Sequence, residues 1–381
     1  MANTLTGLIP ILYQANDIVS RELTGLIPAV TLNADAEQAA KGQTITYPVA
    51  PVSAAVDIAA GVTAPDSGDQ AIGNDTMTIS KSRAVPIRWA GEEVVSIGSM
   101  HGRLLIDQFA QAMRTLTNEV EADLAALYVN ASRAIGPADT SLFKNAGDYS
   151  DAALVRKILV DNGAPISDLQ LVLDTTAGAA IRGKQAQVQM IGSTLLQQQG
   201  ILQDMSGMKI RESAQIKLHV KGTGANSTTN DDGYAVGDTT LTLAAIGTGT
   251  VVAGDQVTFV GDTNKYIVNT GDTDVSDAGT IILNKPGLRI AMSEATKAMT
   301  IGAGYRANLA FARSAIHLVC RTPAMPPGGD MADDVFYLTD PVSGLVFQIA
   351  LYRQYRQIKY EVGLAWGVKA VKSEHMAILI G

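Results

Sequence analysis

The side chains that could hold a metal or form a covalent bond are few and scattered. Cys320 is the only cysteine, which excludes both an intrachain disulfide and a cysteine-based zinc site. No two histidines stand four residues apart, the spacing that places a ligand pair on one helix face. The four histidines are His101, His219, His317 and His375. We therefore expect no metal, and we expect the Cys320 thiol to be buried.

The short motifs that mark common catalytic sites are all incomplete. GTGANS at Gly222 and GAGYRA at Gly302 lack the third glycine of a dinucleotide-binding loop and are predicted to be turns. GDTDVSDAG at Gly271 offers carboxylates to Ca²⁺, but it lacks the glutamate that closes such a loop. In the run 373–375 a serine, a glutamate and a histidine are consecutive, and neighbours on a strand point to opposite faces. The sequence predicts a protein that is not an enzyme, with no cofactor and no catalytic residue.

Basic and aromatic residues are interleaved near the C-terminal end of the chain. The residues are Arg353, Arg356 and Lys359 with Tyr352, Tyr355 and Tyr360. A nucleic-acid reader needs a denser basic face, and the formal net charge of −8 opposes broad contact with phosphates. The preferred interpretation is a charged edge at a protein interface, with Arg353 and Arg356 as candidate interface residues.

The composition indicates a folded chain with much of its surface covered. The chain has 381 residues, of which 46% are hydrophobic and 17% are charged. Ordinary soluble domains carry about 25% charged residues, so the low charge predicts a subunit of a large assembly. The N-terminus, MANTLTGLIPILYQAND, lacks a basic region and is interrupted by Pro10, so neither a signal peptide nor a membrane span is predicted. We expect a cytoplasmic protein.

Hydrophobic periodicity and turn residues divide the chain into six segments. They are an N-terminal arm (1–43), an extended hairpin (44–86), a long helix with its surroundings (87–150), a mixed α+β segment (151–216), an inserted all-β module (217–300) and a strand-rich return (301–381). The expected fold class is α+β.

The hairpin is predicted from two alternating runs, TITYPVAPVSAAVDI and TMTISKSRAVPIRWA, on either side of a turn-rich stretch. Pro48 and Pro51 exclude a central place in a sheet. A lone hairpin is marginal in water, so this arm should lie against another surface. Its candidate interface residues are the apolar Ile45, Val49, Val52, Val56 and Ile58 and the acidic Asp57, Asp66, Asp69 and Asp75.

Helices are expected from Pro10 to Leu23 or Thr24 and from Arg103 to Ala131, the second with a continuous apolar stripe. Further helices are expected at 152–162, 177–184 and 193–198, around a buried strand LQLVLD, with a turn at 206–207 between two more strands. Short strands separated by Gly-Asp dipeptides fill the module: TTLTLAA, DQVTFVG, KYIVN and GTIILN. Apolar residues alternate from Ile358 to Val368, which predicts a half-buried strand, and Met376–Ile380 is expected to pair beside it.

The order of these parts resembles the major capsid proteins of tailed bacteriophages, the Hong Kong 97-type fold, over nearly the whole chain. Within that family it looks most like coat proteins that carry an extra β-barrel, matched here from TTLTLAA to IILNKPG. NLAFARSAIHLVCRTPAMP resembles the strand that returns to the core after the insertion, and IKYEVGLAWGVKAVKSEHMAIL resembles the C-terminal strands. The insertion is shorter than in the best-known relatives.

The resemblance implies an N-terminal arm, an extended hairpin (the E-loop), a spine helix, peripheral and apical domains and an inserted domain. It also implies hexamers and pentamers of an icosahedral head in the virion, assembled in the bacterial cytoplasm. The implied partners are a scaffolding protein, a portal protein, packaged double-stranded DNA bound without sequence specificity, and a decoration protein. Two other classes stay open: a surface-array or fibre subunit, and an α+β hydrolase.

Some shells of this family are welded by an isopeptide bond between a hairpin lysine and a neighbouring asparagine. Between Gly42 and Ser80 this sequence has no lysine; Lys41 and Lys81 stand at the base of the hairpin. We therefore expect a shell held by non-covalent contacts.

Overall fold

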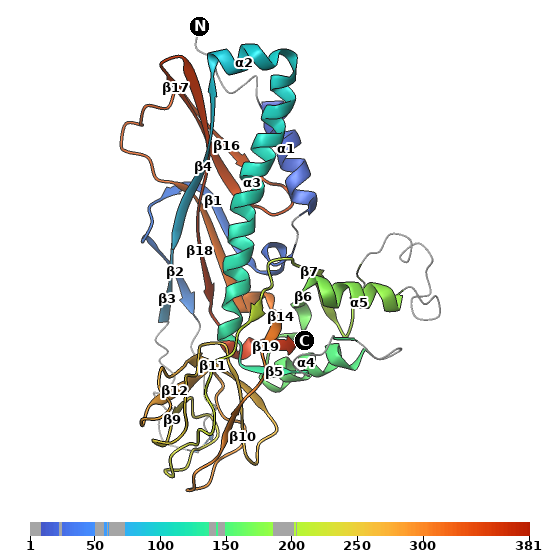
Figure 1. Cartoon of the computed structure of the whole chain (residues 1–381), viewed down its shortest axis with the longest axis vertical. Coiled ribbons are helices and arrows are strands. Elements are labelled where there is room, and N and C mark those ends of the chain that lie inside the picture. Colours follow the sequence, from blue (N-terminus) through green and yellow to red (C-terminus); the bar gives the residue numbers. More distant parts are fainter. Residues whose placement is uncertain are drawn as a thin grey trace.

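The computed structural model is an elongated α+β molecule, described here for residues 9–22, 25–49, 57–58, 60, 73–136, 142–143, 149–185, 202 and 204–381. One end is a long twisted sheet with helices on one face; the other end holds a smaller mixed domain and a β module (Figure 1). The α+β class is confirmed. Within the described residues no helix is long and apolar enough to cross a membrane.

The long sheet has the order β1-β15-β18-β17-β16, and β4 also pairs with β18. Its strands are β1 (Thr31–Ala39), β4 (Lys81–Ala90), β15 (Ile316–Pro323), β16 (Asp334–Thr339), β17 (Val346–Gln354) and β18 (Gln357–Ala370). The buried face predicted for β18 is confirmed at Tyr360, Val362, Leu364 and Trp366, but the prediction of a half-buried strand is wrong for residues 362–367, which are all buried. The opposite face of β18 is also covered near its end, where Ala365 is fully buried.

Three helices lie along this sheet (Figure 1): α1 (Ile9–Glu22), α2 (Gly91–Ile97) and α3 (His101–Ala125), the last continued by a 3₁₀ segment, η4 (Ala126–Asn130). The predicted stripe of α3 is confirmed: Leu105, Phe109, Met113, Leu116 and Val120 are at most 1% exposed. Short 3₁₀ turns complete the helical elements; they are η2 (Ile27–Ala29), η3 (Gly98–Met100), η5 (Ile166–Asp168), η6 (Arg313–Ala315) and η7 (Ser373–His375).

The second sheet runs through the mixed domain into the module, in the order β13-β10-β11-β5-β19-β14-β6-β7. The mixed domain supplies β5 (Arg133–Ile135), β6 (Leu169–Leu173), β7 (Met208–Glu212), β14 (Tyr305–Ala312), β19 (Met376–Ile380) and the helices α4 (Ser150–Asp161) and α5 (Thr175–Gln185). The module supplies β8 (Leu218–His219), β9 (Thr240–Thr242), β10 (Gln256–Phe259), β11 (Lys265–Thr270), β12 (Thr280–Leu283) and β13 (Met299–Ile301). The strands predicted within the module are confirmed, and residues 193–198 lie outside the described residues.

One predicted pairing is wrong: β19 does not join β18. It lies between β14 and β5 in the second sheet, antiparallel to the first and parallel to the second. All five of its residues are buried. The continuous apolar run MAILI suits a central strand covered on both faces.

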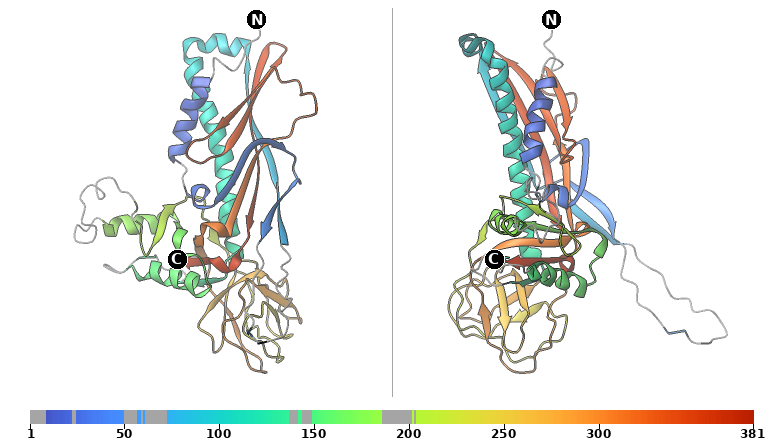
Figure 2. Two further views of the ribbon diagram at one scale, coloured as in Figure 1. Left: turned by 180° about the vertical axis from the view of Figure 1, so that it is seen from behind. Right: turned by 90° about the vertical axis from the view of Figure 1, so that its right-hand side faces the viewer.

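Only the first part of the second predicted run belongs to the hairpin. In the described part of the chain, strand β2 (Thr44–Val49) pairs only with β3 (Gly73–Thr78), in agreement with the exclusion drawn from Pro48. The second run divides after Thr78, and β4 crosses into the long sheet to pair with β18 over ten residue pairs. In the right-hand view of Figure 2, β2 and β3 lead away from the body.

Candidate assembly surfaces

Polar contacts fasten the base of the hairpin to the long sheet. The hairpin base comprises Tyr47 and Asp75 of the hairpin with His317 and Lys369 of the long sheet. The Tyr47 hydroxyl donates a hydrogen bond to Asp75 Oδ2 at 2.7 Å, and the Lys369 ammonium donates to Asp75 Oδ1. The Tyr47 ring stacks on His317 with 5.3 Å between centroids. Lys369 and Tyr47 hold the pKa of Asp75 below its usual range, and burial lowers the pKa of His317. Asp75 is thus bound within its own chain, where the sequence suggested a partner on a neighbour.

Apolar packing fixes the same end of the hairpin. Met77 and Ile79 are almost fully buried against Val319 and Ala365, and Ile45 packs at the edge of this cluster. Gly367 lies beneath Thr78: a Cβ there would stand 2.1 Å from the Thr78 carbonyl oxygen, so only glycine permits this approach. The predicted interface residue Ile45 therefore packs in its own chain, and the base holds the hairpin at a set place on the sheet.

Further along the hairpin, Asp57 and Ile58 are exposed, and the Ile58 side chain is fully so. A free large aliphatic group on an extended arm is a candidate for burial against another molecule. The side chains of Val49, Val52, Val56, Asp66 and Asp69 lie outside the described residues.

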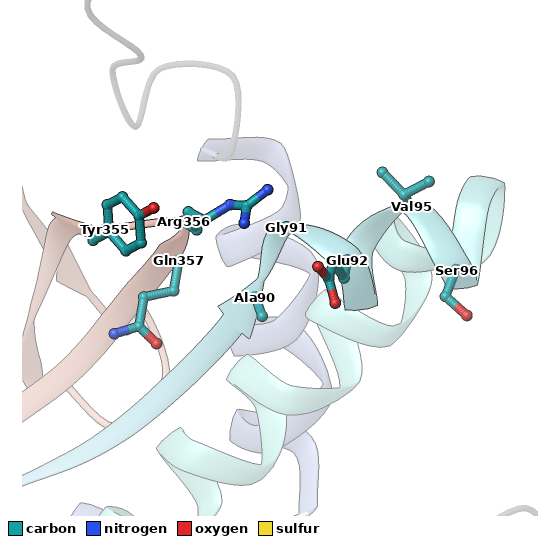
Figure 3. A pocket seen from close by; sticks show the side chains of 8 residues that line it. All are labelled: Ala90, Gly91, Glu92, Val95, Ser96, Tyr355, Arg356 and Gln357. Atoms are coloured by element: carbon teal, nitrogen blue, oxygen red, sulfur yellow. The ribbon is translucent and has the colours of Figure 1, made fainter.

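The tip surface is the open pocket at the far end of the long sheet, about 700 Å³ in volume (Figure 3). In Figure 3, Tyr355 and Arg356, on the turn between β17 and β18, lie across from Glu92 and Val95 on α2. Tyr355 is 90% exposed and Val95 is 82% exposed. Arg356 has φ +55, a left-handed conformation that costs a non-glycine residue about 1 kcal/mol. Apolar groups beside charges of both signs suit a contact with another protein surface.

Arg353 lies near this tip surface and forms an ion pair within the chain. Its Nε stands 3.3 Å from Asp333 Oδ2. The structure thus brings Arg356 to the tip surface and ties Arg353 to the neighbouring loop. Lys359 pairs with Glu361 at 2.7 Å and lies over the Tyr352 ring at 5.5 Å, so part of the basic and aromatic run is also paired within the sheet.

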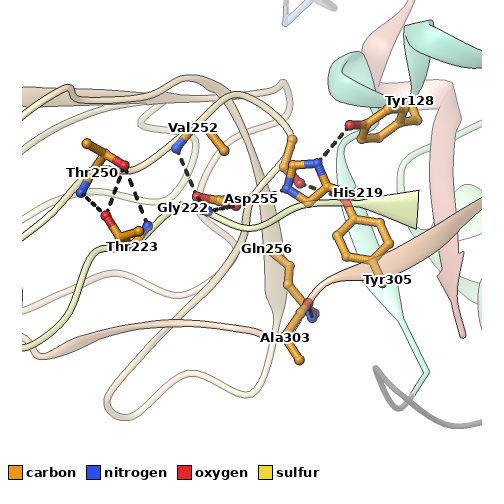
Figure 4. A network of polar contacts seen from close by, with 11 residues as sticks. Tyr128, His219, Gly222, Thr223, Thr250, Val252, Asp255, Gln256, Ala303 and Tyr305 are labelled. Carbon is orange, nitrogen blue, oxygen red and sulfur yellow. Dashed lines mark hydrogen bonds and ion pairs between the residues drawn. The ribbon is translucent and has the colours of Figure 1, made fainter. Parts of the chain in front are cut away.

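A polar joint connects the module to the body, and sequence reasoning missed it (Figure 4). The ring of His219 stands 2.9 Å from Asp255 Oδ1 through Nε2 and 2.8 Å from the Tyr128 hydroxyl through Nδ1. Asp255 also accepts hydrogen bonds from the backbone N–H groups of Gly222 and Val252. The Asp255 side chain is fully buried and that of His219 is 5% exposed.

The joint includes a second set of contacts. The Tyr305 hydroxyl donates to the Gly254 carbonyl at 2.6 Å, and the Asn284 amide donates to the carbonyls of Val129 and Ala131. The first bond ties β14, which follows the module, to Gly254 of the module, and the other two tie the module to the C-terminal end of η4.

An aspartate, a histidine and a hydroxyl in line are also the parts of a nucleophilic relay. Burial and the nearby Asp255 raise the pKa of Tyr128, which disfavours the phenolate. The arrangement therefore suits a structural joint. Within the described residues no group of three metal-ligating side chains is found.

A buried carboxylate fastens the N-terminal segment to the long helix. Glu121 of α3, 2% exposed, accepts hydrogen bonds from the backbone N–H groups of Gly25 and Leu26 and from the Ser213 hydroxyl. Burial raises the pKa of Glu121. Glutamate inside an apolar stripe is the sequence signal that could have indicated this contact, although its partners are about ninety residues away in sequence.

No protein-family model matches this sequence, and no curated protein does. Solved structures with a similar chain path include the capsid of the cyanophage P-SCSP1u, with 11% identity, a TM-score of 0.48 and coverage of 92% of this chain and 86% of that one. Another is the virus-like particle from Pyrococcus furiosus, with 9% identity, a TM-score of 0.45 and coverage of 98% and 99%. A third is from Mycobacterium phage Che8, with 12% identity, a TM-score of 0.42 and coverage of 90% and 85%.

Proposed function

We propose that this chain is the structural subunit of an icosahedral shell, a major capsid protein of the Hong Kong 97-type fold, and not an enzyme. The observation that carries the proposal is the hairpin: its base is packed and hydrogen-bonded on its own chain, while Ile58 further out is fully exposed. An exposed aliphatic side chain does not stabilise an isolated monomer. A shell subunit gains a contact across each subunit boundary.

The remaining geometry agrees with this assignment. The long sheet with its covering helices corresponds to a peripheral domain with a spine helix, the mixed domain to an apical domain, and residues 217–300 to an inserted domain. The exposed tip surface offers a second contact area at the far end of the long sheet. We further propose hexamers and pentamers in the virion head, enclosing double-stranded DNA, with a scaffolding protein, a portal and a decoration protein as partners. Assembly takes place in the host cytoplasm.

The acidic chain suits this role in one more respect. A shell wall built from subunits of formal net charge −8 makes few contacts with phosphates, so counterion release contributes little to binding. DNA would therefore pack inside without binding tightly to the wall.

Negative-stain electron microscopy of the purified chain tests the proposal. Closed shells or rings of subunits are expected. Fibres would favour the surface-array class, and small uniform particles with hydrolase activity would favour the third class; either outcome contradicts the proposal.

A further inference from the structure

A pocket between the module and the mixed domain carries an excess of positive charge. It has a volume of about 190 Å³ and lies where β5, α4 and the start of β11 come together. Its charged side chains are Arg133 of β5, Lys157 and Asp161 of α4, and Lys265 of β11. One water molecule needs only roughly 10 to 15 Å³, so an ion of several heavy atoms fits.

Arg133 is 6% exposed and forms no ion pair in the described part of the chain. Its Nη1 donates to Asn264 Oδ1 at 2.9 Å and its Nη2 donates to Asn162 Oδ1 at 3.1 Å, and both acceptors are uncharged amides. The Nε–H is buried without an acceptor among the described residues. A guanidinium has five N–H donors, and a buried charge is costly unless it is paired. An anion in the pocket would supply the missing partner.

The two lysines add to this positive charge. Lys157 is exposed, lines the pocket and has no ion-pair partner among the residues described. Lys265 donates to the Gly136 carbonyl at 2.6 Å, an uncharged acceptor. Burial lowers the pKa of Lys265, and burial together with the nearby Arg289 lowers the pKa of Arg133. Both shifts have the direction expected of a cation that lacks an anion.

The two carboxylates nearby do not cancel this charge. Asp262 accepts hydrogen bonds from the Tyr266 hydroxyl and from Asn264. Asp161 is exposed, and its effect on Arg133 is weaker than the effect of burial. The four cations outnumber the two carboxylates, so the surroundings of the pocket favour an anion.

We propose that this pocket binds a free tetrahedral oxyanion of the phosphate class. The anion bridges Arg133 and Lys157 of the mixed domain to Lys265 of the module, and so fastens the module in addition to the joint around His219. A phosphate within DNA is the poorer ligand, because Asp161 and the net charge of −8 oppose a long polyanion. The site is independent of the proposed function.

Titration calorimetry of the purified full-length chain with inorganic phosphate, at constant ionic strength in chloride, tests the site. We expect saturable binding of one phosphate per chain, and a melting temperature that rises with phosphate concentration as linkage requires. Substitution of the buried Arg133 could unfold the chain, so the test variant is Lys157→Gln at an exposed position. Its phosphate affinity should fall about fivefold, the effect of losing one exposed ion pair. Lys41→Gln, the same change at an exposed lysine next to the hairpin, should bind phosphate like the wild type.

Three results would overturn the inference. Absence of saturable binding would mean that the pocket takes no phosphate. Equal affinities of the wild type and Lys157→Gln would place the phosphate elsewhere on the chain. Displacement of bound phosphate by a short single-stranded oligonucleotide would assign the pocket to nucleic acid. None of these results bears on shell formation, which electron microscopy scores separately.

Discussion

The hairpin and the inserted module both interrupt the body of the protein, but they are attached in opposite ways. The module has an apolar core of its own, continues the second sheet through β11 and β5, and is fastened by a buried polar joint. Of the described hairpin residues, those at the base pack on the long sheet, whereas the Ile58 side chain is fully exposed. The difference fits the proposal that the hairpin contacts a second subunit, whereas the module packs within its own chain.

Shortening the hairpin should have the largest effect. Val49 and Gly73 face each other in the β2–β3 register, so a two-residue Asn-Gly turn can replace residues 50–72 and keep the base. We expect an unchanged melting temperature and complete loss of closed particles, measured by calorimetry and electron microscopy. Normal particles from this variant would mean that the hairpin is not needed between subunits.

The module joint should be the next most sensitive element. Asp255→Ala leaves His219 and the N–H groups of Gly222 and Val252 without their buried acceptor, at a cost of about 2 to 4 kcal/mol in the free energy of unfolding. Asp238→Ala, which removes an exposed contact to the Ala235 N–H in the same module, is the control and should cost less than about 1 kcal/mol. Equal losses in the free energy of unfolding, measured in urea for the two variants, would show that the joint contributes no more than an exposed contact.

The polar contacts at the hairpin base should contribute less, because they are partly exposed. We expect Asp75→Asn to cost under about 1 kcal/mol at neutral pH. The folded pKa of Asp75 is lowered, so its stabilisation is fully present above the unfolded value of about 3.9 and is lost as the pH falls through the folded pKa. The melting temperatures of wild type and variant should therefore converge in strong acid. A difference that grows as the pH falls would contradict the assignment.

The smallest effect is expected at Cys320. Burial raises the pKa of its thiol to about 11, so it should react with a thiol reagent at pH 8 only after unfolding. The shortened-hairpin chain should show the same slow rate, because Cys320 belongs to the core of the body. Fast labelling in that variant alone would reveal that the hairpin also protects the body.

Local patterns predicted much of this fold, because periodicity and turn residues act over a few positions. The stripe of α3, one buried face of β18 and the short strands of the module all follow from them. The pairing of β19 was predicted wrongly, because an apolar run indicates that both faces of a strand are buried but does not indicate which strand lies beside it. The same limit hid the joint: His219 and Asp255 stand 36 residues apart and Tyr128 lies 91 residues before His219, so only the tertiary fold brings them together.

The candidate interface residues, like the fold, could be predicted from sequence only in part. Sequence indicated that the hairpin carries apolar and acidic residues, and Ile58 and Asp57 are exposed as an interface requires. Sequence could not show that both Ile45 and Asp75 already contact their own chain. Ile45 packs against the cluster that contains Val319, and Asp75 accepts a hydrogen bond from Lys369, although β15 and β18 are about 250 residues or more away in sequence.

The central claim, a hairpin shared between subunits of a closed shell, is tested most directly by cryo-electron microscopy of particles assembled from the purified chain. The predicted result is a continuous hairpin from Thr44 to Thr78 that crosses a subunit boundary and lies on a second copy. A hairpin folded back on its own chain, or a chain that remains a monomer at every concentration, would contradict it.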